Sequence, residues 1–274
     1  MEKPIQLLLL RAYGDFLIAL HLATKNQLKL SIRLIASAHL EPLFKALPIA
    51  LPSNCSIEFH NFHIHNNLFG YFTDRYLFSL GSFIELLALK KFIKFNQTSE
   101  PFYLEQQKRS RLLSICCGHP FQFVVNKQNV YESYARFFKA DLTSLSNSQW
   151  PIDLAQKKVL LLPDARQSKR KITPELIKLI QSGVESKKAN LINGTFGVHY
   201  NNFNELVSLI QQHDIIIGSD SMPIHLAQLL GRPHYIVYPQ FVNPQFFTPF
   251  ALKHQSYFTF EKILAEQSFF LNGK

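Results

Sequence analysis

The sequence contains few cysteines, and their arrangement argues against a disulfide framework. Its 274 residues include three, Cys55, Cys116 and Cys117. An odd number cannot pair completely, and two adjacent cysteines are badly placed to share a bridge or a metal ion. We therefore expect three reduced, buried thiols.

Long apolar runs and a leader pattern are also missing. No window approaches the ~18 consecutive apolar residues that a membrane-spanning helix needs. The amino terminus leads directly into a strand-like apolar run at residues 7–10, without the zones of a cleavable signal peptide. These absences predict a cytoplasmic protein without a membrane-spanning segment.

Several common binding motifs are absent as well. There is no Gly-x-Gly-x-x-Gly and no Walker loop, which argues against a dinucleotide dehydrogenase or a P-loop enzyme. Aromatic residues lie in apolar periodic segments and are not interleaved with Lys and Arg, so we expect no nucleic acid partner. His60, His63 and His65 have a spacing that a metal could use, but no Cys or carboxylate motif accompanies them. We interpret them as a polar loop and expect no metal site.

Positive charge exceeds negative charge, mainly in the amino half. Residues 1–140 contain 16 Lys and Arg against 9 Asp and Glu, whereas residues 141–274 contain 13 against 10. Such a balance suits nucleic acid, an anionic membrane surface or a phosphorylated substrate as the partner. Charge alone does not choose among them.

Apolar runs of strand length alternate with helical periodicity along the whole chain. The expected strands are 5–10, 30–36, 55–59, 102–104, 121–125, 159–162, 189–192, 214–218, 234–238 and 257–260. The expected helices begin near residue 16 and then cover 39–47, 76–95, 108–116, 130–138, 174–181, 204–211, 223–230 and 261–270. This alternation predicts an α/β fold with parallel sheets. The Ser-rich stretch 141–156 is the best linker, so we place one domain at 1–145 and a second, with a closing helix, at 146–274.

The segment 76–95 combines many apolar residues with Lys90, Lys91 and Lys94 near its carboxyl end. A basic, apolar helix of this kind can dock on an anionic bilayer. An ordinary core helix, whose solvated lysines are favoured by the helix dipole, has the same pattern. The sequence leaves both interpretations open.

The strongest candidate for a site is the segment 215–233, IIIGSDSMPIHLAQLLGRP. It indicates a buried strand that turns sharply into a helix ending at Gly231. A helix N-terminus at the carboxyl end of a parallel strand is a ready anion site, and Asp220 there could accept sugar hydroxyls. Alternatively, Asp220 and Ser221 only cap the helix. His225 either lines a cleft or is a packed structural histidine.

This segment resembles the Asp-Ser/Thr-Gly-x-x-His-Leu-Ala-x-Ala-Leu-Gly-x-Pro signature of the heptosyltransferases, glycosyltransferase family nine. Two further motifs follow in the family's order. Residues 11–20, RAYGDFLIAL, are similar to its first strand–turn–helix. Residues 163–166 and 169–175, PDAR and KRKITPE, resemble its basic loop, which reads Lys-x-Trp-Pro in many members. The similarity spans most of the chain.

The resemblance implies a GT-B fold, in which two Rossmann-like parallel-sheet domains enclose a cleft. It implies metal-independent, inverting transfer of a sugar from a nucleotide diphosphate sugar, with ADP-heptose as one candidate donor and no cofactor. The acceptor would be the lipopolysaccharide core or another anionic cell-surface glycan, reached from the cytoplasm at the inner membrane. The implied general base is Asp15, with Gly14 and Arg11 on the acceptor side. The implied donor-binding residues are Arg166, Lys169, Arg170, Lys171, Asp220, Ser221, Met222 and His225, with Lys171 the best match to the family's lysine.

The chain departs from the family pattern in four respects. Met222 replaces a glycine, Thr173 stands where tryptophan is common, and residues 190–198 contain no carboxylate to bind a ribose. The chain is also short. These departures leave two alternatives open, a UDP- or GDP-sugar donor, or a catalytically silent sugar-nucleotide-binding or scaffold protein. Asp15 argues against silence unless it only caps the helix that follows it.

Overall fold

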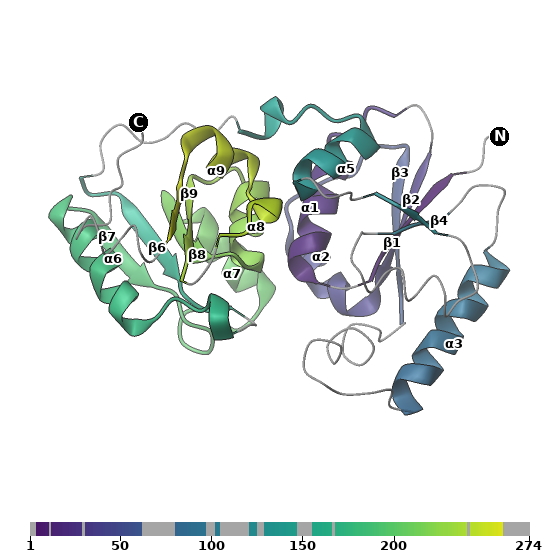
Figure 1. Ribbon diagram of the computed structural model, residues 1–274, viewed down its shortest axis with the longest axis horizontal. Helices are drawn as coiled ribbons and strands as arrows, with labels where there is room; N and C mark the ends of the chain where they lie inside the picture. The colour runs from purple at the N-terminus through teal and green to yellow at the C-terminus, as the bar shows by residue number, and fades with distance from the viewer. Residues whose placement is uncertain are drawn as a thin grey trace. The chain divides into compact units, whose positions relative to one another are not determined.

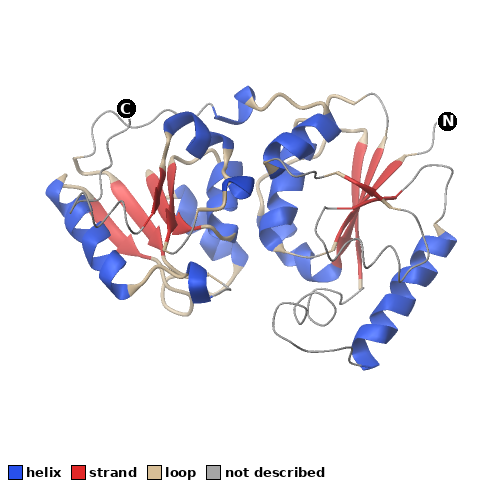
Figure 2. Ribbon diagram, viewed as in Figure 1, coloured by secondary structure: helices blue, strands red, loops and turns tan. Residues whose placement is uncertain are grey.

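The computed structural model describes residues 4–10, 12–28, 31–61, 80–96, 102–104, 121–124, 129–146, 155–165, 168–239 and 242–259. The chain divides into two compact units, residues 1–140 and 141–274, which we describe separately. Both are α/β units with parallel sheets, as predicted (Figures 1 and 2). Several predicted features lie outside the described residues: the helices 108–116 and 261–270, and the side chains of His63, His65, Cys116 and Cys117.

The first unit is built on a parallel sheet with the strand order β3-β2-β1-β4-β5. Its strands are β1 (Ile5–Leu9), β2 (Ile32–Ser37), β3 (Cys55–His60), β4 (Phe102–Leu104) and β5 (Gln122–Phe123). The central strand β1 is almost entirely buried, as expected for a strand covered on both faces. The order changes direction between β1 and β4, and ligands bind parallel sheets at the carboxyl ends of strands beside such a switch point.

Helices cover both faces of this sheet (Figure 1). On one face, α1 (Tyr13–Ala23) packs against α5 (Val130–Phe138), which begins where the Asn129 side chain accepts a hydrogen bond from the N–H of Tyr131 at 2.9 Å. On the other face lies α3 (Leu80–Phe95). Leu89 and Ile93 of α3 join a buried cluster with Leu8, Leu10, Ile35, Phe102, Leu104 and Phe121.

The helix predicted at 39–47 is divided in two. A short 3-10 helix, η1 (Ala38–Leu40), precedes α2 (Glu41–Ala46). Pro42 stands in the first turn of α2, where its missing N–H costs no hydrogen bond. The proline therefore favours a new helix start at this point over continuation of the preceding turn.

The second unit contains the parallel sheet β10-β9-β8-β6-β7. Its strands are β6 (Lys158–Leu162), β7 (Asn190–Asn193), β8 (Ile215–Ser219), β9 (His234–Tyr238) and β10 (Tyr257–Thr259). Counted from β6, the described strands have the doubly wound order 2-1-3-4-5, whereas the first unit has the Rossmann order 3-2-1-4-5. The switch point of the second sheet therefore lies between β6 and β8.

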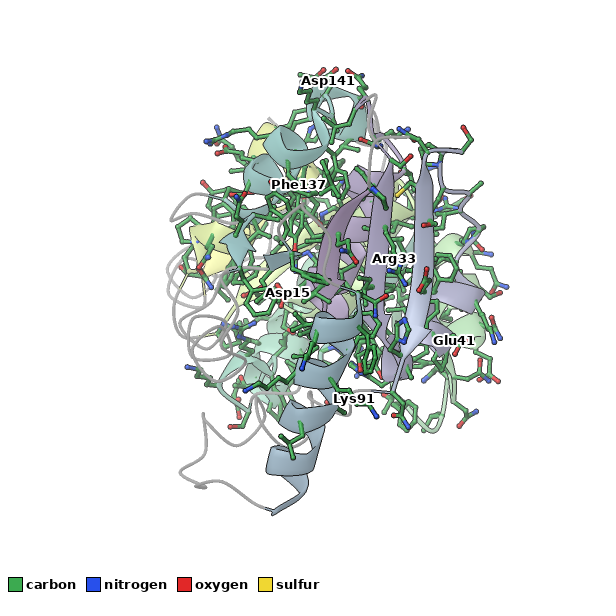
Figure 3. The ribbon with its side chains drawn as sticks, turned by 90° about the vertical axis from the view of Figure 1, so that its right-hand side faces the viewer. Asp15, Arg33, Glu41, Lys91, Phe137 and Asp141 are labelled. Carbon is green, nitrogen blue, oxygen red and sulfur yellow. The ribbon has the colours of Figure 1, made fainter. Side chains whose placement is uncertain are left out.

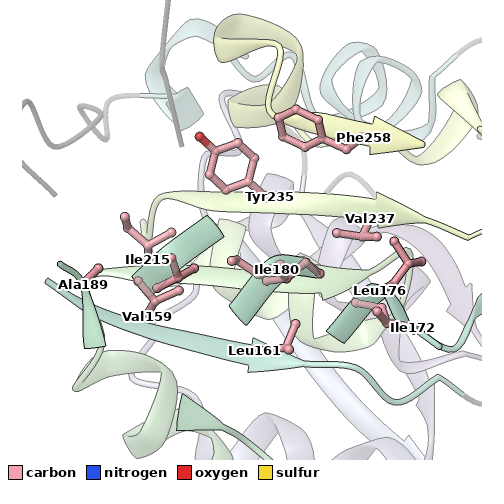
Figure 4. Close-up of a cluster of buried hydrophobic side chains, with 12 residues drawn as sticks. Val159, Leu161, Ile172, Leu176, Ile180, Ala189, Ile215, Tyr235, Val237 and Phe258 are labelled. Carbon is pink, nitrogen blue, oxygen red and sulfur yellow. The ribbon is translucent and has the colours of Figure 1, made fainter. Parts of the chain in front are cut away.

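One face of the second sheet is covered by α6 (Pro174–Ser186), whose Leu176, Ile180 and Val184 pack on β6, β8 and β9 (Figure 4). The helix continues past its predicted end at residue 181, through Gly183. Val184 is fully buried, and burying a side chain of this size contributes about 1.5–3 kcal/mol, more than the ~1 kcal/mol that glycine costs in a helix. Figure 1 shows α7 (Phe203–Gln211), α8 (Met222–Leu229) and α9 (Pro249–His254) on the opposite side of this sheet.

The start of the predicted linker is part of the second unit. Residues 143–146 form the 3-10 helix η3 (Thr143–Ser146), and Leu145 is buried. The Gln228 side chain donates to the Leu145 carbonyl at 2.7 Å and accepts from the Phe250 N–H at 3.0 Å. These buried hydrogen bonds attach η3 to α8 and α9, so this part of the predicted linker is packed on the second unit.

The predicted elements did not include α9. Its start repeats that of α6: Thr248 caps the helix by accepting from the Ala251 N–H, and Pro249 follows as the first helical residue. At six residues it is too short for hydrophobic periodicity to reveal. Within the described ranges, none of the helices combines the length and apolarity needed to cross a bilayer.

Candidate functional site

The candidate site of the second unit lies at the carboxyl ends of β6 and β8, beside the switch point. Leu162 of β6 is paired with Gly218 of β8, and both strands then run into turns. A Cβ atom at Gly218 would lie 3.1 Å from the Ile224 side chain and 3.3 Å from the Leu162 carbonyl oxygen. Glycine here therefore lets the first turn of α8 pack close to the end of the strand.

The start of α8 leaves backbone donors available. Ser221 is the N-cap residue by position, but its hydroxyl donates back to the Ser219 carbonyl at 3.2 Å and does not cap the helix. Pro223 has no N–H, and the Ile224 N–H donates to the Ser221 carbonyl at 3.2 Å. The N–H groups of Ser221 and Met222 have no acceptor within the helix, as is usual for this position. Together with the helix dipole they suit an anion.

Asp220 lies directly before this helix and is held by Arg170. The guanidinium Nη1 of Arg170 lies 3.3 Å from the Asp220 carboxylate and donates to the Asp220 carbonyl at 3.1 Å. Arg170 comes from the 3-10 helix η4 (Ser168–Arg170), which follows β6. The Asp220 side chain is 6% exposed and that of Arg170 is 30% exposed. The contact thus brings one positive charge to the start of α8.

The other members of the predicted basic loop are placed differently. The Lys171 ammonium lies 3.3 Å from the Asp164 carboxylate, and both side chains are about half exposed. Lys169 is exposed, and Arg166 lies outside the described residues. Thr173, at the position where the family commonly has tryptophan, caps α6 by accepting from the Leu176 N–H. Of the described cations in this loop, Arg170 is the one in contact with Asp220.

His225 is buried behind the first turn of α8. Its side chain is 4% exposed, and its ring lies 6.4 Å from that of Phe246 in an edge-on arrangement. Burial, with smaller contributions from His234 and Arg170, lowers the pKa of His225 to about 3. The imidazole is therefore neutral at pH 7 and brings no positive charge to an anion. This geometry favours the packed, structural interpretation of His225.

Tyr238, at the end of β9, was not among the predicted site residues. The last pair between β8 and β9 is Ser219 with Val237, and Asp220 and Tyr238 are the next residues of the two chains. The charge of Asp220 acts on the tyrosine, so the two side chains are near each other. Its hydroxyl is buried without a hydrogen-bond partner among the described residues. Burial and then the charge of Asp220 raise the pKa of Tyr238 far above its usual value, so the hydroxyl stays a neutral donor. The sequence offered one signal for Tyr238, since it is the last residue of the predicted strand 234–238, which directly follows the segment 215–233.

Residues 190–198, which lack the carboxylate that binds a ribose in the family pattern, expose large apolar side chains. After β7 the chain turns at Gly197, whose φ of +83° suits glycine. Phe196 and Val198 are 64% and 74% exposed. His199 accepts a hydrogen bond from the Thr195 N–H at 3.2 Å and holds the turn. A ligand at the carboxyl end of β7 would meet apolar groups here.

In the first unit, Asp15 lies in the first turn of α1 (Figure 3). Its side chain is 8% exposed. The N-cap position belongs to Ala12, so the interpretation of Asp15 as the N-cap is wrong. Gly14 lies partly buried in the same turn, and Arg11 lies outside the described residues. A carboxylate here, after β1 and beside the switch point, is favoured by the positive end of the helix dipole.

No three or more His, Cys, Asp or Glu side chains within the described ranges are grouped so that they could hold a metal ion. His60 instead lies 3.3 Å from the Glu58 carboxylate, and its ring packs on Phe92 with centroids 4.6 Å apart. Cys55 is a free, buried thiol whose pKa is raised to about 11 by burial, as expected for an unreactive cysteine.

Comparison with known proteins finds the fold in glycosyltransferases. No protein-family model and no curated protein sequence matches the chain. The glycosyl transferase family 9 structure from Veillonella parvula is 12% identical with a TM-score of 0.51, covering 98% of this chain and 90% of that chain. The E. coli heptosyltransferase WaaC with ADP is 11% identical with a TM-score of 0.50, covering 93% and 92%. At these identities the likeness concerns the fold, and at that level it confirms the resemblance seen in the motifs.

Proposed function

We propose that the protein is a glycosyltransferase that moves a sugar from a nucleotide diphosphate sugar to a lipopolysaccharide-core or other cell-surface glycan acceptor. The observation that carries this proposal is the contact between Arg170 and Asp220 beside the start of α8, at the switch point of the second sheet. It combines a cation and open N–H groups for phosphates with a carboxylate for sugar hydroxyls. The likeness in fold to WaaC, whose structure contains ADP, supports the same reading.

In the proposed donor complex, the diphosphate lies against the Ser221 and Met222 N–H groups. Arg170 contributes the charge that balances the phosphates, with Lys169 and Lys171 nearby in sequence. Since Arg170 is partly exposed, its guanidinium can move from Asp220 to a phosphate while Asp220 turns to the sugar hydroxyls. These positive groups would stabilise the leaving nucleoside diphosphate without a metal ion.

The proposed reaction proceeds with inversion at the anomeric carbon, and Asp15 is the proposed general base. It takes the proton of the acceptor hydroxyl as the oxygen attacks the anomeric carbon and the bond to the diphosphate breaks. This step requires the two units to form the halves of a GT-B enzyme with the reaction between them. The donor is a substrate, with a heptose as the candidate sugar, and the protein would work in the cytoplasm at the inner membrane.

A thermal-shift screen with ADP-, UDP-, GDP- and CMP-sugars tests this function. We expect one of them to raise the melting temperature in proportion to the logarithm of its concentration. At about 100 times its dissociation constant the ligand stabilises the fold by about 2.7 kcal/mol. For the ADP-, UDP- and GDP-sugars the corresponding nucleoside monophosphates are the control, because they lack the second phosphate and should give a smaller shift. No shift with any of these sugars at millimolar concentration would contradict the proposal.

Replacing Tyr238 with Phe tests whether its hydroxyl meets the donor. Because the hydroxyl is buried and no described residue bonds to it, Tyr238→Phe should leave the unliganded protein as stable or about 1 kcal/mol more stable. Loss of a hydrogen bond to the donor should weaken binding of the nucleotide sugar by about 2- to 12-fold. Urea unfolding and calorimetric titration measure the two effects. The control is Tyr235→Phe on the opposite face of β9, and equal donor affinity in both variants would exclude Tyr238 from the site.

A further inference from the structure

We propose that the outward face of α3 docks the protein on an anionic lipid bilayer. This face consists of Leu87, Lys90, Lys91, Lys94 and Phe95. The sequence alone allowed either a core helix or an interfacial helix at this place. In the structure, one side of α3 packs against the sheet as in a core helix, and the opposite side is exposed as in an interfacial helix.

The spacing of the residues separates the two sides. Leu87, Lys91 and Phe95 follow one another at intervals of four residues, which places them in a row on one face of the helix. Lys90 and Lys94 are also four residues apart, and the 3.6-residue turn of the helix places them beside this row. Leu89 and Ile93 lie on the opposite side, where they are 0% and 3% exposed in the buried cluster of the first sheet. The outward row is thus not needed to cover the sheet.

The outward row exposes large apolar groups beside lysines. Phe95 is 77% exposed and Leu87 is 48% exposed. The Lys91 ammonium lies 5.9 Å from the centroid of the Phe95 ring. Exposed apolar side chains between long basic ones suit an interfacial helix, because the apolar groups enter the acyl boundary while the ammonium groups stay at the headgroups.

The charge of this face is uncompensated within the described part of the chain. Lys90, Lys91 and Lys94 are exposed, and no ion pair joins any of them to another described residue. Residues 87–96 include no Asp or Glu. Three lysines on one side of a helix therefore form a positive surface that is complementary to anionic headgroups.

The helix is also held firmly to the sheet at its carboxyl end (Figure 3). Asn96, directly after α3, accepts from Arg33 Nη1 at 3.2 Å through its side chain, and its carbonyl accepts from the Gln6 side chain at 3.2 Å. Arg33 is itself paired with Glu58 at 2.6 and 2.7 Å. Docking would thus use a helix that is already formed at this end.

Co-sedimentation of the full chain with vesicles tests the proposal. We expect binding to mixed phosphatidylglycerol and phosphatidylcholine vesicles, and little binding to phosphatidylcholine alone. A basic residue near such a surface contributes about 1 kcal/mol, or about fivefold in affinity. The triple variant Lys90→Gln, Lys91→Gln, Lys94→Gln should therefore lose about 100-fold, and Phe95→Ser a further few-fold. Binding should also fall between low and physiological salt.

A second triple variant, Lys178→Gln, Lys188→Gln, Lys253→Gln, removes the same charge from exposed positions of the second unit and should bind like the parent. Equal loss in both triple variants, or equal binding to neutral and anionic vesicles, would overturn the proposal. The proposal would also be overturned if the parent bound a single-stranded RNA oligonucleotide more tightly than the vesicles and the α3 variants lost RNA binding together with vesicle binding. Nucleotide-sugar shifts should be unchanged in the α3 variants, so the donor-site proposal and the docking proposal can fail separately.

Discussion

Asp15→Asn is expected to reduce sugar transfer by about 10²–10⁴ while donor binding stays largely intact. Loss of a general base typically has an effect of this size, because the acceptor oxygen must then attack while it keeps its proton. The amide preserves the size of the side chain in the first turn of α1. Its lost charge should lower the free energy of unfolding by only about 0.3–1 kcal/mol through the helix dipole. Initial rates with the donor identified by the thermal-shift screen, together with donor affinity by calorimetry, measure the effect.

Asp141→Asn is the matched control for this substitution. Asp141 is an exposed carboxylate that accepts from the Thr143 N–H at 2.9 Å at the start of η3, so it also supports the start of a helical turn. We expect this variant to transfer sugar at the rate of the parent. Turnover of Asp15→Asn within a few-fold of the parent would exclude Asp15 as the base. Tight donor binding by a parent that transfers no sugar would instead favour the catalytically silent alternative.

Arg170→Ala is expected to weaken binding of the nucleoside diphosphate by about 10- to 150-fold. Charge-assisted hydrogen bonds to phosphate contribute about 1.5–3 kcal/mol each, and Arg170 is the described cation of the loop that contacts the start of α8 through Asp220. Lys171→Ala should weaken binding less, although the motif alone favours Lys171. The Lys171 ammonium lies near Asp164 and at half exposure, where an ion pair contributes at most about 1 kcal/mol. Calorimetric titration with ADP, UDP and GDP compares the two variants.

Removing Arg170 also leaves the Asp220 carboxylate buried without this cation, so stability must be measured beside affinity. Since the Arg170 side chain is 30% exposed, solvent screens the pair, and we expect a loss of about 1–3 kcal/mol in urea unfolding. Arg170→Lys retains the charge and should recover part of the affinity. A larger loss of affinity in Lys171→Ala than in Arg170→Ala would return the phosphate contact to Lys171. Unchanged affinity in alanine variants of Lys169, Arg170 and Lys171 alike would remove the loop from the site.

The sequence by itself determined the α/β class, the parallel sheets and most elements of the two units. Apolar runs such as Leu7–Leu9 and Ile215–Ile217 lie fully within buried strands. Gly231, which has a positive φ, marks the end of α8, and Thr173 caps the start of α6. Both signals depend only on backbone atoms of neighbouring residues. These signals are local, so one chain suffices to interpret them. The same locality explains why the predicted elements did not include η3 and α9, which are short and held by contacts with Gln228.

Only the tertiary structure decided which side chains meet. Arg170 and Asp220 are 50 residues apart, and their contact depends on the pairing of β6 with β8. The position of the Tyr238 hydroxyl near Asp220, without a hydrogen bond to any described residue, depends on the register of β8 and β9. The neutrality of His225 depends on burial. Likewise, the two faces of α3 became distinct only when Leu89 and Ile93 were seen against the sheet. Charge, burial and hydrogen bonding act through space. A sequence pattern therefore predicts only the interactions between residues that are near one another in the chain.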